Sequence, residues 1–210
     1  MGGYRPAMGR PRADQITTAT PERVLDAAEA VFADSGFAAA KLADIAARAG
    51  IRRPSLLHHF ETKEALYAAT VQRCFARLRD GLITAMHVEG GFESRLVATV
   101  SRYVEFLEAN PTVARLILRE IVSGQGPGAR ILVDEVAPLV EIVEVFLRRE
   151  GRASDRPELP IRAALMQVAS DILLRAAAGP LREPLWGPRD EAATLARILL
   201  LGMLDEGRPR

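Results

Sequence analysis

Apolar residues recur at helical spacing along most of this chain, and that periodicity limits the fold more than any other feature. Near the N-terminus, a stripe at i, i+1, i+4, i+7 and i+8 is formed by Val24, Leu25, Ala28, Val31 and Phe32. Such a stripe occupies one face of a helix. No segment of useful length alternates apolar and polar residues at period two, as a half-buried strand does. The sequence therefore predicts an all-α protein.

Residues that interrupt helices divide the pattern into about nine segments. We expect helices at residues 20–36, 42–49, 53–60, 62–86, 92–110, 111–123, 131–149, 160–178 and 189–205. Gly36 should end the first helix, and Thr62 should cap the fourth. The segments GQGPG at 124–128 and GPLREPLWGP between the last two helices are predicted to be loops.

Composition excludes several classes of protein. The 210 residues are 49% hydrophobic and 26% charged, which is typical of a globular chain and not of a disordered one. The single cysteine, Cys74, cannot form an internal disulfide, and its place on an apolar helix face favours a buried thiol over a reactive one. The chain has no run of 18 uncharged apolar residues and no secretory signal, so we expect a cytoplasmic protein with no membrane partner.

The most specific signal lies at residues 42–60. A short helix, a tight turn at Gly50 and a second short helix, all preceded by a longer helix, form the pattern of a helix-turn-helix. In that motif the N-terminal residues of the second helix reach base edges in the major groove of DNA. Arg52 and Arg53 stand there, although arginine opposes the helix dipole and caps poorly, at a local cost of about 1–2 kcal/mol. Contact with DNA would explain that cost, and the alternative is a pair of solvated arginines before a helix stiffened by Pro54.

Residues 20–67 resemble the TetR family of one-component transcriptional regulators. The resemblance rests on three segments in order, RVLDAAEAVFADSGF, LADIAARAGIRRPSLLHHF and ETKEALY. It implies a homodimeric repressor that binds a palindromic DNA operator and is released when a small-molecule effector enters the C-terminal domain. The implied contacts with double-stranded DNA come from Thr20, Arg53, Pro54, Ser55, His58, His59 and Lys63.

The chain departs from the family pattern inside the same motif. Leu57 stands where the family most often has a tyrosine that contacts DNA, so this contact is absent. Lys41 and Arg52 stand where hydroxyl residues usually open the two short helices. Both side chains are expected to contact phosphates by charge instead.

The predicted organisation has three parts. Residues 1–20 form a basic arm, residues 21–81 form the DNA-binding domain, and residues 82–210 form a helical bundle for effector binding and dimerisation. Within the arm, Arg10 and Arg12 are suited to a minor groove, where arginine reads groove width. A plain basic tail is an equal alternative.

Two sets of residues in the C-terminal part are candidates for binding. Polar or aromatic side chains within apolar helix faces are expected to line an effector pocket, namely Tyr103, Phe106, Arg115, Met166, Gln167 and Ser170. Apolar stripes on the last two helices are expected to form a dimer interface, namely Leu165, Val168, Ala169, Ile172, Leu173, Leu195, Ile198 and Leu199. For each pocket candidate, ordinary packing is the alternative.

Other functions lack a signature in this sequence. The chain has no nucleotide-binding, serine-hydrolase or zinc-protease motif, so we expect neither enzymatic activity nor a cofactor. His58 and His59 are neighbours on a helix and project apart, so they are not expected to bind a metal. Their protonation would strengthen DNA binding below about pH 6.5. An all-α enzyme and a helical adaptor that uses the motif for protein contacts are the rival functions.

Overall fold

The computed structural model describes residues 20–151, 153, 156–187 and 191–205. Within these residues the regular structure is entirely helical, which confirms the predicted fold class. The helices are α1 (Thr20–Ala39), α2 (Leu42–Arg48), α3 (Arg53–His59), α4 (Lys63–Met86), α5 (Phe92–Ala109), α6 (Pro111–Ser123), α7 (Gly126–Glu150), α8 (Ile161–Ala177), α9 (Arg182–Trp186) and α10 (Ala192–Asp205), with a short 3-10 turn at Gly179–Leu181 before α9.

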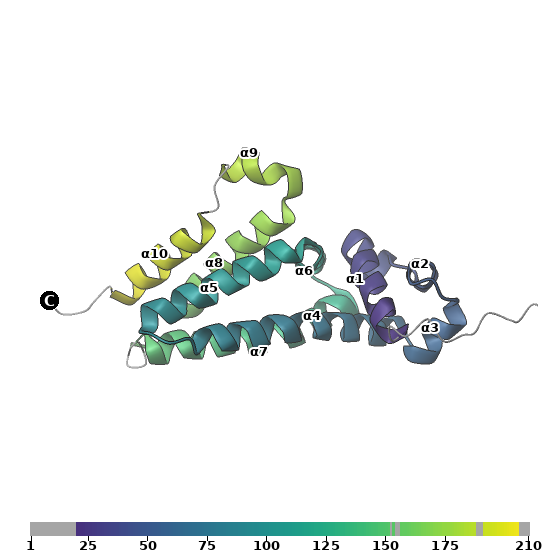
Figure 1. Ribbon diagram of the computed structural model, residues 1–210, viewed down its shortest axis with the longest axis horizontal. Helices are drawn as coiled ribbons and strands as arrows, with labels where there is room; N and C mark the ends of the chain where they lie inside the picture. The colour runs from purple at the N-terminus through teal and green to yellow at the C-terminus, as the bar shows by residue number, and fades with distance from the viewer. Residues whose placement is uncertain (1–19, 152, 154–155, 188–190, 206–210) are drawn as a thin grey trace, which may run out of the picture.

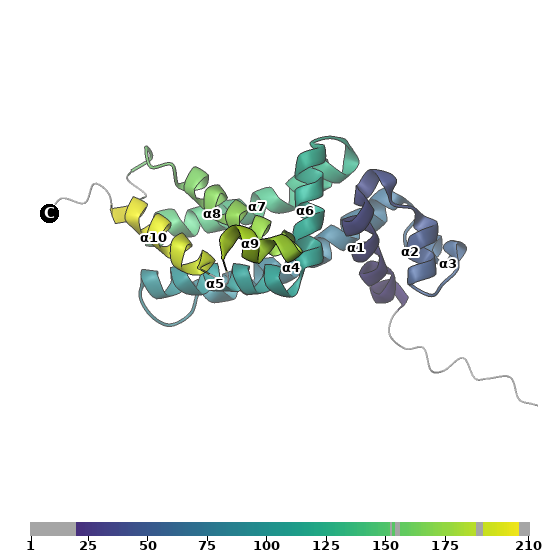
Figure 2. The same cartoon turned by 90° about the horizontal axis from the view of Figure 1, so that it is seen from above.

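The molecule is elongated, with α1, α2 and α3 grouped at one end of the long axis and α10 toward the other (Figures 1 and 2). Helix α4 runs from the helix-turn-helix unit along the length of the bundle that it forms with α5, α7 and α8 (Figure 1). The expected division after residue 81 therefore falls inside one continuous helix. Helix α6 packs against both α1 and α8, so it lies between the N-terminal unit and the bundle.

Two local sequence signals act at the positions where they were expected, a glycine in α1 and a threonine before α4. The backbone at Gly36 has φ 75°, a value that favours glycine, and it kinks α1 at the point where the sequence predicts a stop. The chain then completes one more turn as far as Ala39. At the start of α4, the Thr62 hydroxyl accepts a hydrogen bond from the Ala65 N–H at 3.0 Å, so the predicted cap is confirmed.

The prediction of a loop over 124–128 is wrong in its second half, because α7 begins at Gly126 instead of residue 131. Pro127 lies in the first turn, where its fixed φ fits a helix and its missing N–H costs nothing. A Cβ at Gly128 would lie 2.7 Å from Cβ of Phe37. The glycines read as loop signals therefore allow the first turn of α7 to pack closely on α1.

The described residues contain ten α-helices where about nine were expected, because α9 forms within the segment predicted to be a loop. Its five residues are too few to show periodicity. The Trp186 Nε1–H donates to Asp171 Oδ1 at 3.2 Å, and the Arg175 guanidinium lies 5.8 Å from the Trp186 ring centroid. These contacts with α8 hold α9 in place.

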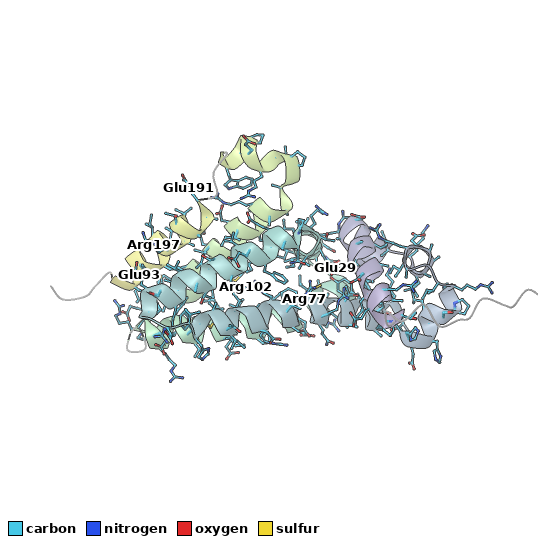
Figure 3. The ribbon with its side chains drawn as sticks, viewed as in Figure 1. Glu29, Arg77, Glu93, Arg102, Glu191 and Arg197 are labelled. Atoms are coloured by element: carbon cyan, nitrogen blue, oxygen red, sulfur yellow. The ribbon has the colours of Figure 1, made fainter. Side chains whose placement is uncertain are left out.

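The last helix is attached to the bundle by apolar contacts and by an ion pair. Ala192, Ala196, Leu200 and Leu204 of α10 are buried, and Arg197 pairs with Glu93 of α5 at 2.9 Å (Figure 3). At the other end of the bundle, Arg77 of α4 donates to Asn110 Oδ1 at the α5–α6 junction at 3.0 Å. Among the described helices, none combines the length and apolar character that a membrane span requires.

Candidate nucleic-acid interface and ligand cavity

The turn between α2 and α3 has the geometry of a helix-turn-helix. Gly50 adopts φ 67°, and the Ile51 N–H donates to the Ala46 carbonyl at 3.0 Å, which closes the turn. Arg52 is extended and precedes α3, whose first turn contains Pro54. Ile45 on α2 and Leu56 on α3 are fully buried. These two side chains fix the orientation of α3 on the unit.

The opposite face of α3 is exposed. It carries most of the side chains predicted to contact DNA, namely Arg53, Pro54, Ser55, His58 and His59, and Arg52 is exposed just before it. Because Leu56 holds the helix from behind, these side chains point away from the core as a group. Leu57 is only half-buried. The arrangement presents cations, a hydroxyl and two imidazoles on one short exposed face.

The other predicted DNA contacts lie around this surface. Lys41 is exposed just before α2, and Thr20 is half-buried at the start of α1. The Lys63 ammonium donates to the Ala38 carbonyl at 2.9 Å and lies 4.8 Å from the Phe37 ring centroid. It therefore ties α4 to the end of α1, and an ammonium has three donors, so a phosphate contact is compatible with this role. Arg10 and Arg12 lie outside the described residues.

A cavity of about 450 Å³ lies within the bundle. Its wall is almost wholly apolar and comes from α4, α5, α6, α7 and α8, with Leu200 added from α10. Ile121 and Val133 on the wall are 59% and 61% exposed, and Met166 is also exposed, so the cavity opens between α6, α7 and α8. Among the described residues that line it, Arg162 alone is charged. Such a cavity suits an apolar ligand with few polar groups.

Three of the six residues predicted for the pocket line this cavity, namely Tyr103, Met166 and Ser170. The Tyr103 hydroxyl donates to the Ala169 carbonyl at 3.3 Å, and burial raises the pKa of Tyr103. The prediction is wrong for the other three. Phe106 is buried in the core, Arg115 is exposed to solvent, and Gln167 borders a separate small hollow between α8 and α10. A polar residue in an apolar stretch does not reveal which side of its helix faces the cavity.

The predicted dimer interface divides into two groups. All five α8 residues line the cavity, and Val168, Ile172 and Leu173 are buried within the chain, so they are not available to a partner. The apolar stripe on α8 was identified correctly, but its neighbours α5, α6 and α7 cover it. On α10, Leu195, Ile198 and Leu199 are exposed, and this part of the interface stays a prediction.

A buried carboxylate on α6 was not predicted from the sequence. Glu120 is 4% exposed, and its Oε1 accepts a hydrogen bond from the Phe37 backbone N–H at 3.0 Å. Ile117 and Ile121 of the same helix line the cavity. The Tyr67 hydroxyl is buried nearby without a hydrogen-bond partner among the described residues, and burial followed by the Glu120 charge raises the pKa of Tyr67. The sequence signal that could have revealed Glu120 is an acidic residue in an otherwise apolar stripe.

A metal site has no structural support in the part of the chain that the structure describes. No group of three or more histidine, cysteine or acidic side chains there could hold an ion. His58 and His59 pack edge to face, with ring centroids 5.6 Å apart.

Comparison with known proteins connects both halves of the chain to one family. The family model described as "Bacterial regulatory proteins, tetR family" matches residues 24–70, which contain the helix-turn-helix. The HTH-type transcriptional activator FasR of Mycolicibacterium smegmatis is 30% identical over 172 residues, which cover 81% of this chain and 78% of FasR. That match extends well beyond the N-terminal unit.

Solved structures share the fold. The fatty acid degradation regulator FadR of Bacillus halodurans aligns with a TM-score of 0.69 at 18% identity and covers 89% of this chain and 99% of FadR. FadR of Bacillus subtilis, solved in complex with stearoyl-CoA, aligns with a TM-score of 0.66 at 14% identity and covers 88% and 97%. Together with the match to FasR, these findings agree with the expectation that the chain is not an enzyme. The chain therefore belongs to the tetR family of bacterial transcriptional regulators, and its helix-turn-helix unit is a DNA-binding domain.

Proposed function

We propose that this protein is a repressor that binds a palindromic operator as a homodimer and releases it when a long-chain acyl effector occupies the cavity. The observation that carries the proposal is the position of α6. Ile117 and Ile121 on this helix line the cavity, while Glu120 between them holds the backbone of Phe37 in the DNA-binding unit. A ligand that displaces the cavity wall would therefore act directly on α1.

The exposed face of α3 supports operator binding. In a helix-turn-helix dimer, two recognition helices about 34–36 Å apart read successive major grooves, so the operator repeats as a palindrome. The exposed side chains of Leu195, Ile198 and Leu199 on α10 support a homodimer, since a partner would remove them from water. We assign residues 21–81 to DNA binding and residues 82–210 to effector binding and dimerisation.

The shape of the cavity supports a linear ligand. Its lining on α7 extends from Leu132 to Leu147, which is about 22 Å along a helix axis. The volume falls in the range of small-molecule pockets, and the wall offers few groups for hydrogen bonding. An alkyl chain fits these properties. The stearoyl-CoA complex of FadR, which has the same fold, supports this choice of ligand class.

The sign of regulation depends on where the operator lies relative to the promoter. We propose repression, because release by an effector then allows transcription when the effector accumulates. The relative FasR is named an activator, so a reporter gene must decide this point. A repressor predicts that deletion of the protein raises expression from its target promoter, whereas an activator predicts a fall. Because chromosomal DNA is the proposed partner, we place its action in the cytoplasm.

Selection from random-sequence DNA duplexes tests operator binding. We expect the full-length protein to enrich one palindrome and to lose affinity for it by orders of magnitude between about 50 and 200 mM salt. Enrichment of no sequence, together with affinity that salt leaves unchanged, would contradict operator binding and favour an adaptor that uses this unit for protein contacts.

A further inference from the structure

The only charge on the described cavity wall lies at one end of its opening. Arg162 is in the first turn of α8, and its side chain is 57% exposed while it lines the cavity. From this position we infer that Arg162 binds the anionic head group of the effector, either a carboxylate or a phosphate. The inference rests on the proposed acyl-effector function and adds the charge of the ligand and its direction in the cavity.

The Arg162 side chain already binds an anionic oxygen beside the cavity. Its Nε–H donates to Glu144 Oε2 at 2.8 Å, so the ion pair joins α8 to α7 beside the opening. Glu144 is shared, because Arg148 donates its Nε–H and Nη2–H to the other oxygen, Oε1, at 3.1 Å each. Burial opposes ionisation of Glu144, but the hydrogen bonds from Arg162 and Arg148 lower its pKa.

This sharing allows Arg162 to change partners. Glu144 pairs with two guanidinium groups, with Arg148 at one carboxylate oxygen and Arg162 at the other. If Arg162 turns from Glu144 to a ligand, Glu144 keeps its contacts with Arg148. The Arg162 side chain is also more than half exposed, so its ion pair with Glu144 is screened by water and easily exchanged. A guanidinium binds carboxylate and phosphate oxygens in a planar, bidentate geometry, which favours an anionic head group.

The position of the cluster also orients the ligand. Glu144 lies eleven residues after Val133 on α7, a distance of about 16 Å along the helix. Val133 is on the cavity wall together with Ile117 and Ile121 of α6. A ligand held by Arg162 at its head group would therefore extend its apolar tail toward α6, the helix that contacts the DNA-binding unit.

Binding of three ligands with the same sixteen-carbon chain tests this inference. Palmitate, palmitoyl-CoA and 1-hexadecanol, each below the concentration at which it forms micelles, are measured by equilibrium dialysis against the full-length protein. The variants are Arg162→Gln, Arg162→Lys and, as a matched control, Arg149→Gln, which alters an exposed arginine of α7 away from the cavity lining. Thermal unfolding of each variant checks that the fold is retained.

We expect Arg162→Gln to weaken binding of at least one anionic ligand by tenfold or more, with hexadecanol unchanged. Arg162→Lys keeps the positive charge but not the bidentate geometry, so it should recover part of this binding, and Arg149→Gln should have no effect. Loss with palmitate identifies a carboxylate at Arg162, and loss with palmitoyl-CoA alone identifies a phosphate. The inference is overturned if the wild type binds hexadecanol as tightly as both anions, or if Arg162→Gln weakens all three equally. If no ligand binds the wild type, the acyl-effector function itself fails, and this inference fails with it.

Discussion

Glu120 on α6 accepts a hydrogen bond from the Phe37 N–H at 3.0 Å, and this bond joins the wall of the cavity to the DNA-binding unit. Phe37 follows the kink at Gly36, and its ring packs edge to face on Tyr67, with centroids 5.1 Å apart. The contact therefore includes the end of α1 and the first turns of α4. These are the elements that set the position of α2 and α3.

Replacement of Glu120 tests this connection. Glu120→Ala leaves the Phe37 N–H without its acceptor, so we expect the free energy of unfolding to fall by about 1–3 kcal/mol. We also expect a weaker effect of palmitoyl-CoA on operator affinity. Glu120→Gln keeps an oxygen acceptor, so it should reduce the free energy of unfolding and the effect of palmitoyl-CoA by less than Glu120→Ala does. Urea unfolding and operator titrations measure the two effects, and an alanine variant equal to the wild type in both would contradict the connection.

Arg53 should contact DNA, either at a base edge or at a phosphate. Because Arg53 is exposed in the first turn of α3, Arg53→Ala should weaken operator binding by about 1–3 kcal/mol without changing the fold. A loss confined to the selected operator indicates base contact, and an equal loss on random duplexes indicates phosphate contact. Arg149→Ala is the matched control. Unchanged affinity for both kinds of DNA would show that Arg53 does not contact DNA.

The thiol of Cys74 should be unreactive in the folded protein. Burial raises its pKa to about 12, and Glu29, whose Oε2 lies 3.3 Å from Sγ, contributes to that shift. Since an exposed thiol has a pKa near 8.5, the protonated thiol stabilises the fold fully below that pH, and its contribution is lost as pH rises toward 12. We expect negligible reaction with Ellman's reagent at pH 8 and rapid reaction in urea. Rapid labelling of the native protein would show that Cys74 is accessible.

Ile198 tests the dimer interface on α10. Its side chain is 57% exposed on an apolar face, so Ile198→Glu should convert a dimer into a monomer and weaken operator binding with it. Ile83→Glu changes an isoleucine of α4 that is 38% exposed and serves as the control. Sedimentation equilibrium measures the mass of each. An Ile198→Glu variant that stays dimeric would exclude this face as the interface.

The fold could be predicted from the sequence because its helices are long and carry clear stops. The kink at Gly36 and the cap at Thr62 follow from local chemistry that needs no knowledge of the tertiary structure. Helix α9 could not be predicted, since five residues contain no repeat and are held by Trp186 and its contacts with α8. The start of α7 was obscured because Gly128, read as a loop residue, is needed for close packing.

The candidate site was only partly predictable for a different physical reason. Periodicity identifies the apolar face of a helix but not the element that covers it. Ile172 and Leu173 were therefore predicted to contact a second subunit, although they line the cavity within this chain. The exposed residues of α3 were easier to predict, because the spacing of a helix-turn-helix fixes which face of that helix is buried. Glu120 required the structure, since its partner is a backbone N–H 83 residues away in sequence.

We propose that a ligand in the cavity controls how tightly the protein binds DNA. Fluorescence anisotropy of the selected operator, titrated with palmitoyl-CoA, tests it in the wild type, in Val140→Trp, which fills the cavity, and in Val145→Trp, which changes an exposed residue of the same helix. We expect the wild type and Val145→Trp to release the DNA, and a folded Val140→Trp to retain it. Retention of DNA by the wild type, or equal release from all three proteins, would contradict it.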